Sequence, residues 1–429
     1  MPKAHDILGM NARNSQYISQ NNTQAKSVAS SKYATKILLE DNNIPTPKIY
    51  AILATNEDVQ DFDWKSIEGS FVVKPTNGHA GKGVLILNKK SKHTDTWSNT
   101  LGQQLSPDDI KLHCSDILEG QYSTWGSQHN VIVEERILTH PVFKKYTYKG
   151  TPDIRVVVFN QVPIMALLRL PTKESEGRAN QSQGAIGVGI DIATGVTTFA
   201  AANLNEPISY LPGTKFKLNG IKIPQWKSLL HVAVRAAEAS NLYYSGIDLF
   251  LDADQGPMVV EINSSPGLSI QNANRSGLKR RLERVEGLNV RNPEHGVRIG
   301  QALFASNFAD KIKSEEGLQV LSPFETVVVT GEDKQTQELL ALMNTGRYRT
   351  AIATSTAETL GLIDIEDLLW FQQETGEGKI PVVEVTFKLG RRKITTSAVV
   401  SKRLNRGKYR MEIGRKDLSG FLVGDSNTS

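Results

Sequence analysis

The chain has 429 residues, more than one hydrophobic core usually holds, so we expect two or three domains. Hydrophobic residues make up 39% and charged residues 22%, as in soluble globular proteins, and no apolar run is long enough to span a bilayer. The net charge of +5 suits attraction of an acidic substrate or a nucleotide, but the basic residues are scattered, which argues against nucleic-acid binding.

The N-terminal part predicts an arm, a helix and a series of strands. Residues 1–30 are rich in Asn, Gln and Ser, which predicts an irregular arm without the apolar segment of a secretion signal. The single cysteine, Cys114, cannot form an internal disulfide, so we expect a cytoplasmic protein. Residues 31–41 favour a helix. The expected strands lie at 49–53, at both ends of 71–87, and at 131–134, 154–159 and 164–170.

The rest of the chain predicts one long helix and then a change of character. A polar loop at 171–186 precedes an amphipathic helix at 225–240. A helix is expected at about 297–313, and a boundary near 315–317. Short strands then follow one another, which indicates a small all-β domain; they are 326–330, 380–387 and 394–400. The expected parts are therefore an arm at 1–30, a first domain at 31–316 and a β domain at 320–429.

Two neighbouring apolar strands carry oxygen-bearing side chains at their ends. Asp248 lies near the end of the first, and Glu261 and Asn263 lie two residues apart on the second. Alternate strand residues point to one face, so Glu261 and Asn263 share a side at a spacing of about 7 Å. Ordinary strands with polar ends would explain Asp248 alone. Hard oxygen ligands beside the Ser264–Gly267 turn instead favour Mg²⁺ held against nucleotide phosphates.

Three further segments carry candidate nucleotide contacts. Lys74 ends a strand before a glycine-rich turn whose backbone N–H groups suit a phosphate, although such hairpins are common and this one is not a P-loop. The glycines are Gly78, Gly81 and Gly83. Glu134 and Glu135 end another strand, where a carboxylate suits the adenine amino group but is usually solvated. Asp153 and Arg155 share a strand face, as a simple ion pair or as a ribose contact.

In their order along the chain, these motifs resemble the ATP-grasp superfamily of carboxylate–amine ligases. The nearest resemblance is to the RimK type, which adds glutamate to a ribosomal protein, and to the alpha-L-glutamate-ligase-like subgroup. The segments Ile7–Asn14 and Lys32–Lys36 add to this resemblance, which covers about residues 7–275. It implies an α+β fold in which two α+β subdomains clasp ATP.

The resemblance also implies roles for single residues. Lys32 and Lys74 would contact phosphates beneath the 78–83 loop, although Ser31 stands where the family usually has Asp before the first lysine. Metal binding would involve two Mg²⁺ ions, with Mn²⁺ as an alternative, on Asp248, Glu261 and Asn263. The remaining implied contacts are Glu134, Glu135 and Ile137 to adenine, Asp153 to ribose, and Arg178 and Asn180 near the transferred phosphoryl group.

The implied reaction joins a carboxylate to an amine through an acyl phosphate, with Lys74 and Arg178 neutralising phosphate charge. The expected partners are a small-molecule or peptide acid and an amine, such as glutamate, without nucleic acid or membrane. Arg155 and Arg169 are candidates for gripping a substrate carboxylate, or form simple ion pairs. A phosphotransferase and a nucleotide-dependent peptide-binding scaffold remain the alternatives.

The C-terminal segments suggest a second resemblance. Ala341–Arg347 and Met411–Leu418 look like the retropepsin-like domain associated with RimK-type ligases, identified there as a zinc protease. That fold presents Asp-Thr-Gly at its catalytic turn, and paired aspartates activate water. Here Asn344 takes the position of the Asp, and an amide is no general base. We therefore predict a non-proteolytic module that binds a peptide or forms a homo-oligomer.

Overall fold

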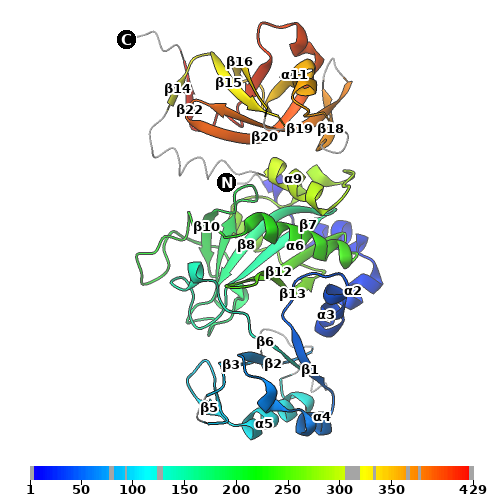
Figure 1. Ribbon diagram of the computed structural model, residues 1–429, viewed down its shortest axis with the longest axis vertical. Coiled ribbons are helices and arrows are strands. Elements are labelled where there is room, and N and C mark those ends of the chain that lie inside the picture. The colour runs from blue at the N-terminus through cyan, green and yellow to red at the C-terminus, as the bar shows by residue number, and fades with distance from the viewer. Residues whose placement is uncertain are drawn as a thin grey trace. The chain divides into compact units, whose positions relative to one another are not determined.

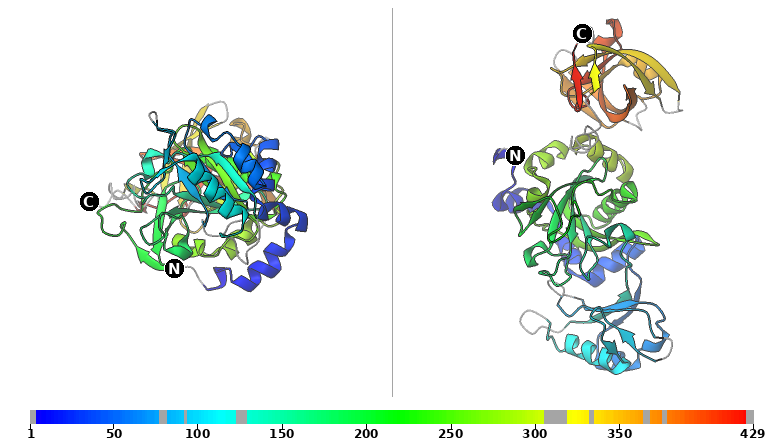
Figure 2. Two further views of the ribbon diagram at one scale, coloured as in Figure 1. Left: turned by 90° about the horizontal axis from the view of Figure 1, so that it is seen from below. Right: turned by 90° about the vertical axis from the view of Figure 1, so that its left-hand side faces the viewer.

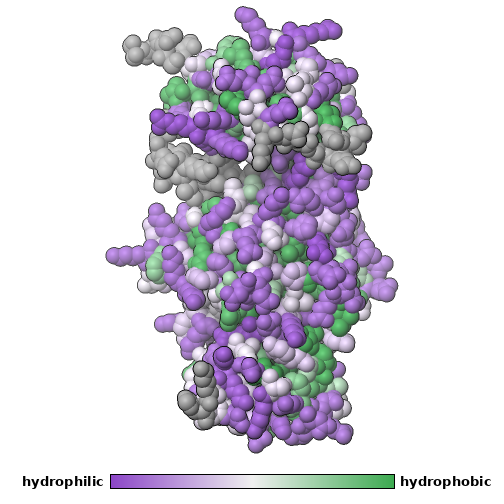
Figure 3. Space-filling model, viewed as in Figure 1, coloured by the Kyte–Doolittle hydropathy of each residue, from purple (hydrophilic) through white to green (hydrophobic). Residues whose placement is uncertain are grey.

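The computed structural model describes residues 4–76, 82–91, 94–122, 129–304, 319–331, 335–363, 368–374 and 378–424. It has two compact units, one made of Met1–Ile190 and Thr197–Glu286, the other of Asp191–Val196 and Gly287–Ser429. The expected boundary at 315–317 lies outside the described residues, and the expected domain limits stay predictions. In the described ranges, no helix is both long and apolar enough to cross a membrane. Hydrophilic side chains cover much of the face in Figure 3.

A small antiparallel sheet with the strand order β1-β6-β2-β3 forms one part of the first unit (Figure 1). Its strands are β1 (Ile49–Leu53), β2 (Phe71–Pro75), β3 (Leu85–Leu87) and β6 (Val131–Glu135). Two helices, α4 (Asn56–Asp61) and α5 (Pro107–Leu118), and the short strands β4 (Trp97–Ser98) and β5 (Gln104–Leu105) accompany it. Apolar residues from the sheet and both helices, including Phe71, Val59 and Ile110, form one buried cluster, so burial holds this layer together.

A seven-stranded antiparallel sheet forms the centre of the first unit, with the order β11-β10-β9-β8-β7-β12-β13. The amphipathic helix α6 (Trp226–Ala239) contacts β7, β8, β12 and β13, as its apolar stripe predicts. The helices α7 (Ile270–Asn274) and α8 (Lys279–Val285) follow the sheet. The strands are β7 (Asp153–Phe159), β8 (Val162–Leu170), β9 (Ile186–Ile190), β10 (Thr197–Ala202), β11 (Glu206–Ile208), β12 (Tyr244–Asp252) and β13 (Gly256–Asn263).

The N-terminal arm is helical in its described part, so the expectation of an irregular arm was wrong. It contains α1 (Met10–Ala12), further short turns of helix and α2 (Thr23–Ser30), followed by α3 (Lys32–Asp41). Local polar residues explain this: the Asn22 side chain caps α2 by accepting from two backbone N–H groups. Asn21 then fixes the arm to β12, since its Nδ2 donates to the Tyr244 carbonyl at 2.7 Å and its Oδ1 accepts from the Tyr244 N–H at 2.9 Å.

The second unit consists mainly of strands, with α9 (Pro293–Phe304) and α11 (Thr354–Thr359) (Figures 1 and 2). Its sheet has the order β15-β16-β21-β17-β20-β19-β18, and β15 also pairs with β19 and so closes part of the sheet on itself. A buried apolar cluster fills the interior. The strands are β14 (Gln319–Leu321), β15 (Phe324–Thr330), β16 (Thr336–Asn344), β17 (Ala351–Ala353), β18 (Trp370–Glu374), β19 (Gly378–Leu389), β20 (Arg392–Ser401), β21 (Met411–Gly414) and β22 (Phe421–Val423).

Candidate functional site

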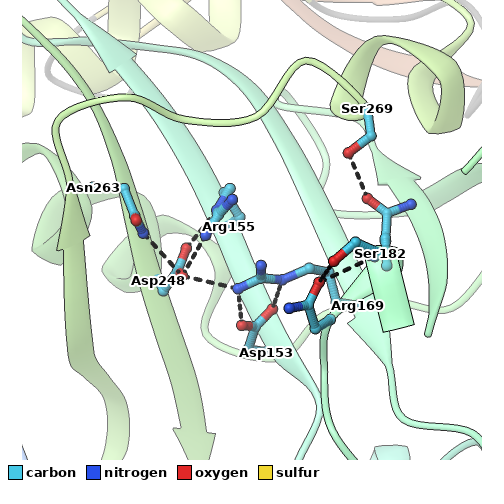
Figure 4. A network of polar contacts seen from close by, with 9 residues as sticks. Asp153, Arg155, Arg169, Ser182, Asp248, Asn263 and Ser269 are labelled. Carbon is cyan, nitrogen blue, oxygen red and sulfur yellow. Dashed lines mark hydrogen bonds and ion pairs between the residues drawn. The ribbon is translucent and has the colours of Figure 1, made fainter. Parts of the chain in front are cut away.

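The structure brings the three predicted metal ligands to one face of the β12–β13 pair. In the antiparallel register Asp248 lies opposite Glu261, and Gly246 lies opposite Asn263, so all three side chains share a face. The Asn263 Nδ2 donates to the Asp248 Oδ2 at 3.2 Å (Figure 4). The alternation of side chains along the strands is the physical reason that the sequence anticipated this arrangement.

Two arginines from neighbouring strands hold the Asp248 carboxylate. Arg155 on β7 donates from Nε and Nη2 to the two carboxylate oxygens, each at 2.6 Å. Arg169 on β8 donates to Asp248 Oδ2 at 2.8 Å and also pairs with Asp153 (Figure 4). Sheet pairing explains the cluster, because Arg155 lies opposite Asp248 and Asp153 lies opposite Arg169. Asp153, the predicted ribose contact, thus forms one network with Asp248 and with Arg155 and Arg169, the two candidates for binding a substrate carboxylate.

Within this network the pKa values of the two acids, Asp153 and Asp248, shift in opposite directions. Burial favours the neutral form of Asp248, but the charges of Arg155 and Arg169 outweigh it and lower the pKa of this carboxyl. Burial raises the pKa of Asp153 to about 6, and the negative charge of Asp248 adds to that shift while Arg169 opposes it. Both carboxyls are therefore ionised at neutral pH, and Asp153 is the first of the two to take up a proton as pH falls.

The donor set of this face fits a hard divalent cation. In the described ranges no group of three or more His, Cys, Asp and Glu side chains is arranged to hold a metal ion. Asp248, Glu261 and Asn263 instead supply two carboxylates and an amide, the oxygen ligands that Mg²⁺ and Mn²⁺ accept. Glu261 is exposed, and the lowered pKa of Asp248 keeps that carboxylate ionised, so both can bind a cation. Asp248 would have to give up contacts with the guanidinium groups to do so.

A second cluster joins Lys36 and Lys74 to the buried carboxylate of Glu134. The Lys36 Nζ lies 2.6 Å from Glu134 Oε2 and donates to the Pro47 carbonyl at 2.6 Å, while Lys74 pairs with Oε1. Burial lowers the pKa of Lys36 to about 8, with Lys74 adding to the shift and Glu134 opposing it. The two lysines outweigh burial and lower the pKa of Glu134. In this structure each carboxylate oxygen of Glu134 is therefore paired with a lysine, and its adenine contact stays a prediction.

Sequence reasoning missed Lys36 and selected only Lys32. Ser31 accepts from the Ala34 N–H as the N-cap of α3, and Lys32 begins that helix. Burial lowers the pKa of Lys32, whereas the negative charges of Glu261 and Glu134 raise it. Lys36 follows four residues later on the same helical face, which is the signal that could have found it.

The structure describes only some of the remaining predicted nucleotide contacts. Gly78 and Gly81 lie outside the described residues. Gly83 has a φ of +72°, and a Cβ there would meet the Tyr122 ring at 2.8 Å, so the position requires glycine. Glu135 accepts from Gln255 Nε2 at 2.9 Å. Ile137 is buried.

Arg178 and Asn180 lie on the loop between β8 and β9. Arg178 pairs with the exposed Glu176 at 3.1 Å, and Asn180 accepts from the Ser182 N–H and hydroxyl. In the part of the chain that the structure describes, neither is hydrogen-bonded to the Asp248 network. Their predicted place near a transferred phosphoryl group therefore stays a prediction.

Comparison with known proteins identifies relatives of this chain. Glutathione biosynthesis bifunctional protein GshAB of Desulfotalea psychrophila is 24% identical over 250 residues, which is 56% of this chain and 31% of that protein. Tetrahydromethanopterin:alpha-L-glutamate ligase of Methanocaldococcus jannaschii is 24% identical over 238 residues, 56% of this chain and 59% of the relative. The chain thus spans less than two thirds of either relative.

Solved structures with detectable similarity include two ligases. The ATP-grasp ligase PsnB complexed with a minimal precursor is 17% identical with a TM-score of 0.34, over 62% of each chain. D-alanine--D-alanine ligase from Bacillus anthracis complexed with ATP is 15% identical with a TM-score of 0.35, over 69% of this chain and 71% of that one. The family assignment does not depend on these low scores. A family model described as sugar-transfer associated ATP-grasp matches residues 12–287. Because this match covers more than half of the sequence, the chain belongs to the sugar-transfer associated ATP-grasp family and has the ATP-grasp fold.

Proposed function

We propose that the chain is an ATP-dependent ligase that joins a carboxylate to an amine. The observation that carries this proposal is the face of β12 and β13, where Asp248, Glu261 and Asn263 lie together beside two arginines. Oxygen ligands for a divalent cation next to guanidinium groups suit a reaction between a polyphosphate and a carboxylate. Membership of an ATP-grasp family supports ATP as the nucleotide.

In the proposed reaction, a carboxylate oxygen of the acid attacks the γ-phosphorus of ATP, which gives an acyl phosphate and releases ADP. The amine then attacks the acyl carbon, loses a proton, and expels phosphate to leave an amide. Mg²⁺ bound by Asp248, Glu261 and Asn263 would supply charge neutralisation for the phosphates. The lysines at positions 32, 36 and 74 contact the phosphates, and Arg155 and Arg169 orient the acid; Arg178 neutralises the transferred phosphoryl group.

The finer assignment is the addition of glutamate or another amino acid to a peptide or a small acid. The name of the Methanocaldococcus jannaschii relative, an alpha-L-glutamate ligase, supports glutamate as the first amino acid to test. The two polar clusters are equally compatible with several acids, because guanidinium groups recognise the carboxylate rather than the rest of the molecule.

We propose that the β-rich part of the second unit is a retropepsin-like module without protease activity. The support is the Asn344 position: its Oδ1 accepts from the Gly346 and Arg347 N–H groups at 3.1 Å, and β16 pairs there with β21. The Asn344 amide has no basic group with which to activate water. Absence of pepstatin-sensitive cleavage of a casein substrate by the full chain is the expected result, and clear cleavage would refute the assignment.

The ligase assignment is tested by incubating the chain with ATP, Mg²⁺ and a panel of amino acids and peptides. Mass spectrometry is expected to detect a condensation product, and phosphate release is expected to depend on both acid and amine. Glu261→Gln should lose this activity, with Glu57→Gln as a control on exposed helix α4. A phosphorylated product that forms without an amine would favour a phosphotransferase. ATP binding without turnover across the panel would favour a scaffold.

A further inference from the structure

A surface of lysines and aromatic rings lies beside the candidate site. It is defined here as the lysine–aromatic surface and consists of Lys145, Tyr148, Lys149, Lys173, Phe216 and Lys217. The loop between β6 and β7 supplies the first three, and the other residues come from the loops after β8 and β11. The lysines are distant in sequence, and folding gathers them.

Contacts between ammonium groups and rings hold this surface together. The Lys145 Nζ lies 5.0 Å from the Tyr146 ring centroid and 5.4 Å from that of Phe216. Lys149 and Lys173 both approach the Tyr148 ring, at 5.5 and 5.9 Å. Tyr146 and Phe216 pack edge to face at 6.0 Å, which joins the loop before β7 to the loop after β11.

Among the residues that the structure describes, no carboxylate pairs with the ammonium groups of this surface. In the described ranges, none of Lys145, Lys149, Lys173 and Lys217 forms an ion pair with a carboxylate, and all four are exposed. The Asp248 and Glu134 networks of the same unit are, by contrast, paired. Unpaired ammonium groups clustered on ordered loops attract a multiply charged anion.

The surface adjoins the end of the sheet where Asp153 and Arg169 lie. The Tyr148 N–H donates to the Pro171 carbonyl at 3.1 Å, one residue beyond the end of β8. A Cβ on Gly150 would lie 1.8 Å from the Gly177 carbonyl, so the two loops touch directly before Arg178. A bound chain can therefore extend from these lysines toward the arginine network of Figure 4.

We propose that the lysine–aromatic surface docks an acidic segment of a polypeptide substrate, an inference that rests on the proposed ligase function. Carboxylates complement the unpaired ammonium groups, and the adjoining site is built to hold a carboxylate. Single-stranded nucleic acid fits less well because base stacking needs open ring faces. Tyr146 is buried, Tyr148 is flanked by two ammonium groups, and the exposed Phe216 ring already has the Lys145 ammonium group over it at 5.4 Å.

The test measures binding of fluorescein-labelled octaglutamate to the full chain by anisotropy, with octaglutamine as the neutral counterpart and an octauridylate RNA as the rival. Wild type is expected to bind octaglutamate selectively, and salt is expected to weaken binding. The triple variant Lys145→Gln, Lys149→Gln, Lys173→Gln should bind it about tenfold or more weakly. Lys379→Gln, Lys388→Gln, Lys393→Gln removes the same charge from exposed positions of β19 and β20 and should bind within about twofold of wild type.

Two results would overturn the proposal: equal weakening in both triple variants, or tighter binding of the RNA than of octaglutamate. ATP affinity, measured in parallel, is expected to be unchanged in both variants and reports that the fold is intact. Because the peptide assay needs no turnover, its failure is distinct from failure of the ligase assignment, which the condensation assay reports.

Discussion

Replacing Arg155 by Met is expected to destabilise the central sheet in a pH-dependent way. Arg155 makes two hydrogen bonds of 2.6 Å to Asp248, whose side chain is 3% exposed. Removing one partner of a buried ion pair costs about 3–5 kcal/mol when the other charge is stranded. Arg169 and Asn263 still contact Asp248, so we expect a smaller loss, about 2–3 kcal/mol at pH 8.

The pH dependence follows from the pKa of Asp248. In the wild type this pKa is lowered, so the stabilisation is present above the unfolded value and is lost as pH falls through the folded value. Without Arg155, burial has the larger effect and raises the pKa of Asp248. Protonation of Asp248 then removes its buried negative charge as pH falls, which reduces the loss of stability in the variant. The difference in melting temperature between variant and wild type should therefore shrink from pH 8 to pH 5. Hydrogen exchange in β12 peptides assigns the effect to this strand, and an equal difference at both pH values would refute the reasoning.

Three further predictions test other parts of the molecule. Tyr244→Phe should leave stability unchanged or raise it by up to about 1 kcal/mol in thermal unfolding, because the buried Tyr244 hydroxyl has no hydrogen-bond partner among the described residues; a loss above that size would contradict the structure. Gly83→Ala should cost about 1–3 kcal/mol, since φ is +72° and the new Cβ meets the Tyr122 ring, whereas Gly9→Ala, which meets nothing, should be far milder. If Lys36 contacts phosphate, ATP affinity in titration calorimetry should fall as pH rises through about 8, where this lysine loses its charge. Lys36→Met should bind ATP more weakly and lack this pH dependence, and a pH profile identical to wild type would exclude the role.

Residue patterns within a single strand or helix predicted part of the fold and of the central site. Side-chain alternation fixes the common face of Glu261 and Asn263, whereas the position of Arg155 opposite Asp248 depends on the register of two strands far apart in the sequence. The amphipathic pattern of residues 225–240 likewise predicted α6, which spans Trp226–Ala239.

Features that depend on tertiary contacts were not accessible to such rules. Strand β9 was missed because Gly187 and Gly189 lower its strand propensity. Glycine is needed at position 189, where a Cβ would lie 2.6 Å from the Ala273 carbonyl. At position 187 a Cβ would lie 2.0 Å from Gln181 Nε2, so the Gln181 side chain would have to move. The lysine–aromatic surface was also invisible, because its lysines are scattered in sequence and only the folded loops collect them.

The central claim is that Asp248, Glu261 and Asn263 hold a divalent cation at the nucleotide. The most direct test is Mn²⁺ binding followed by electron paramagnetic resonance in the presence of a non-hydrolysable ATP analogue. Wild type and Glu57→Gln should bind Mn²⁺ alike, and Glu261→Gln and Asn263→Ala should each bind it about tenfold or more weakly. Unchanged Mn²⁺ affinity in both site variants would contradict the account.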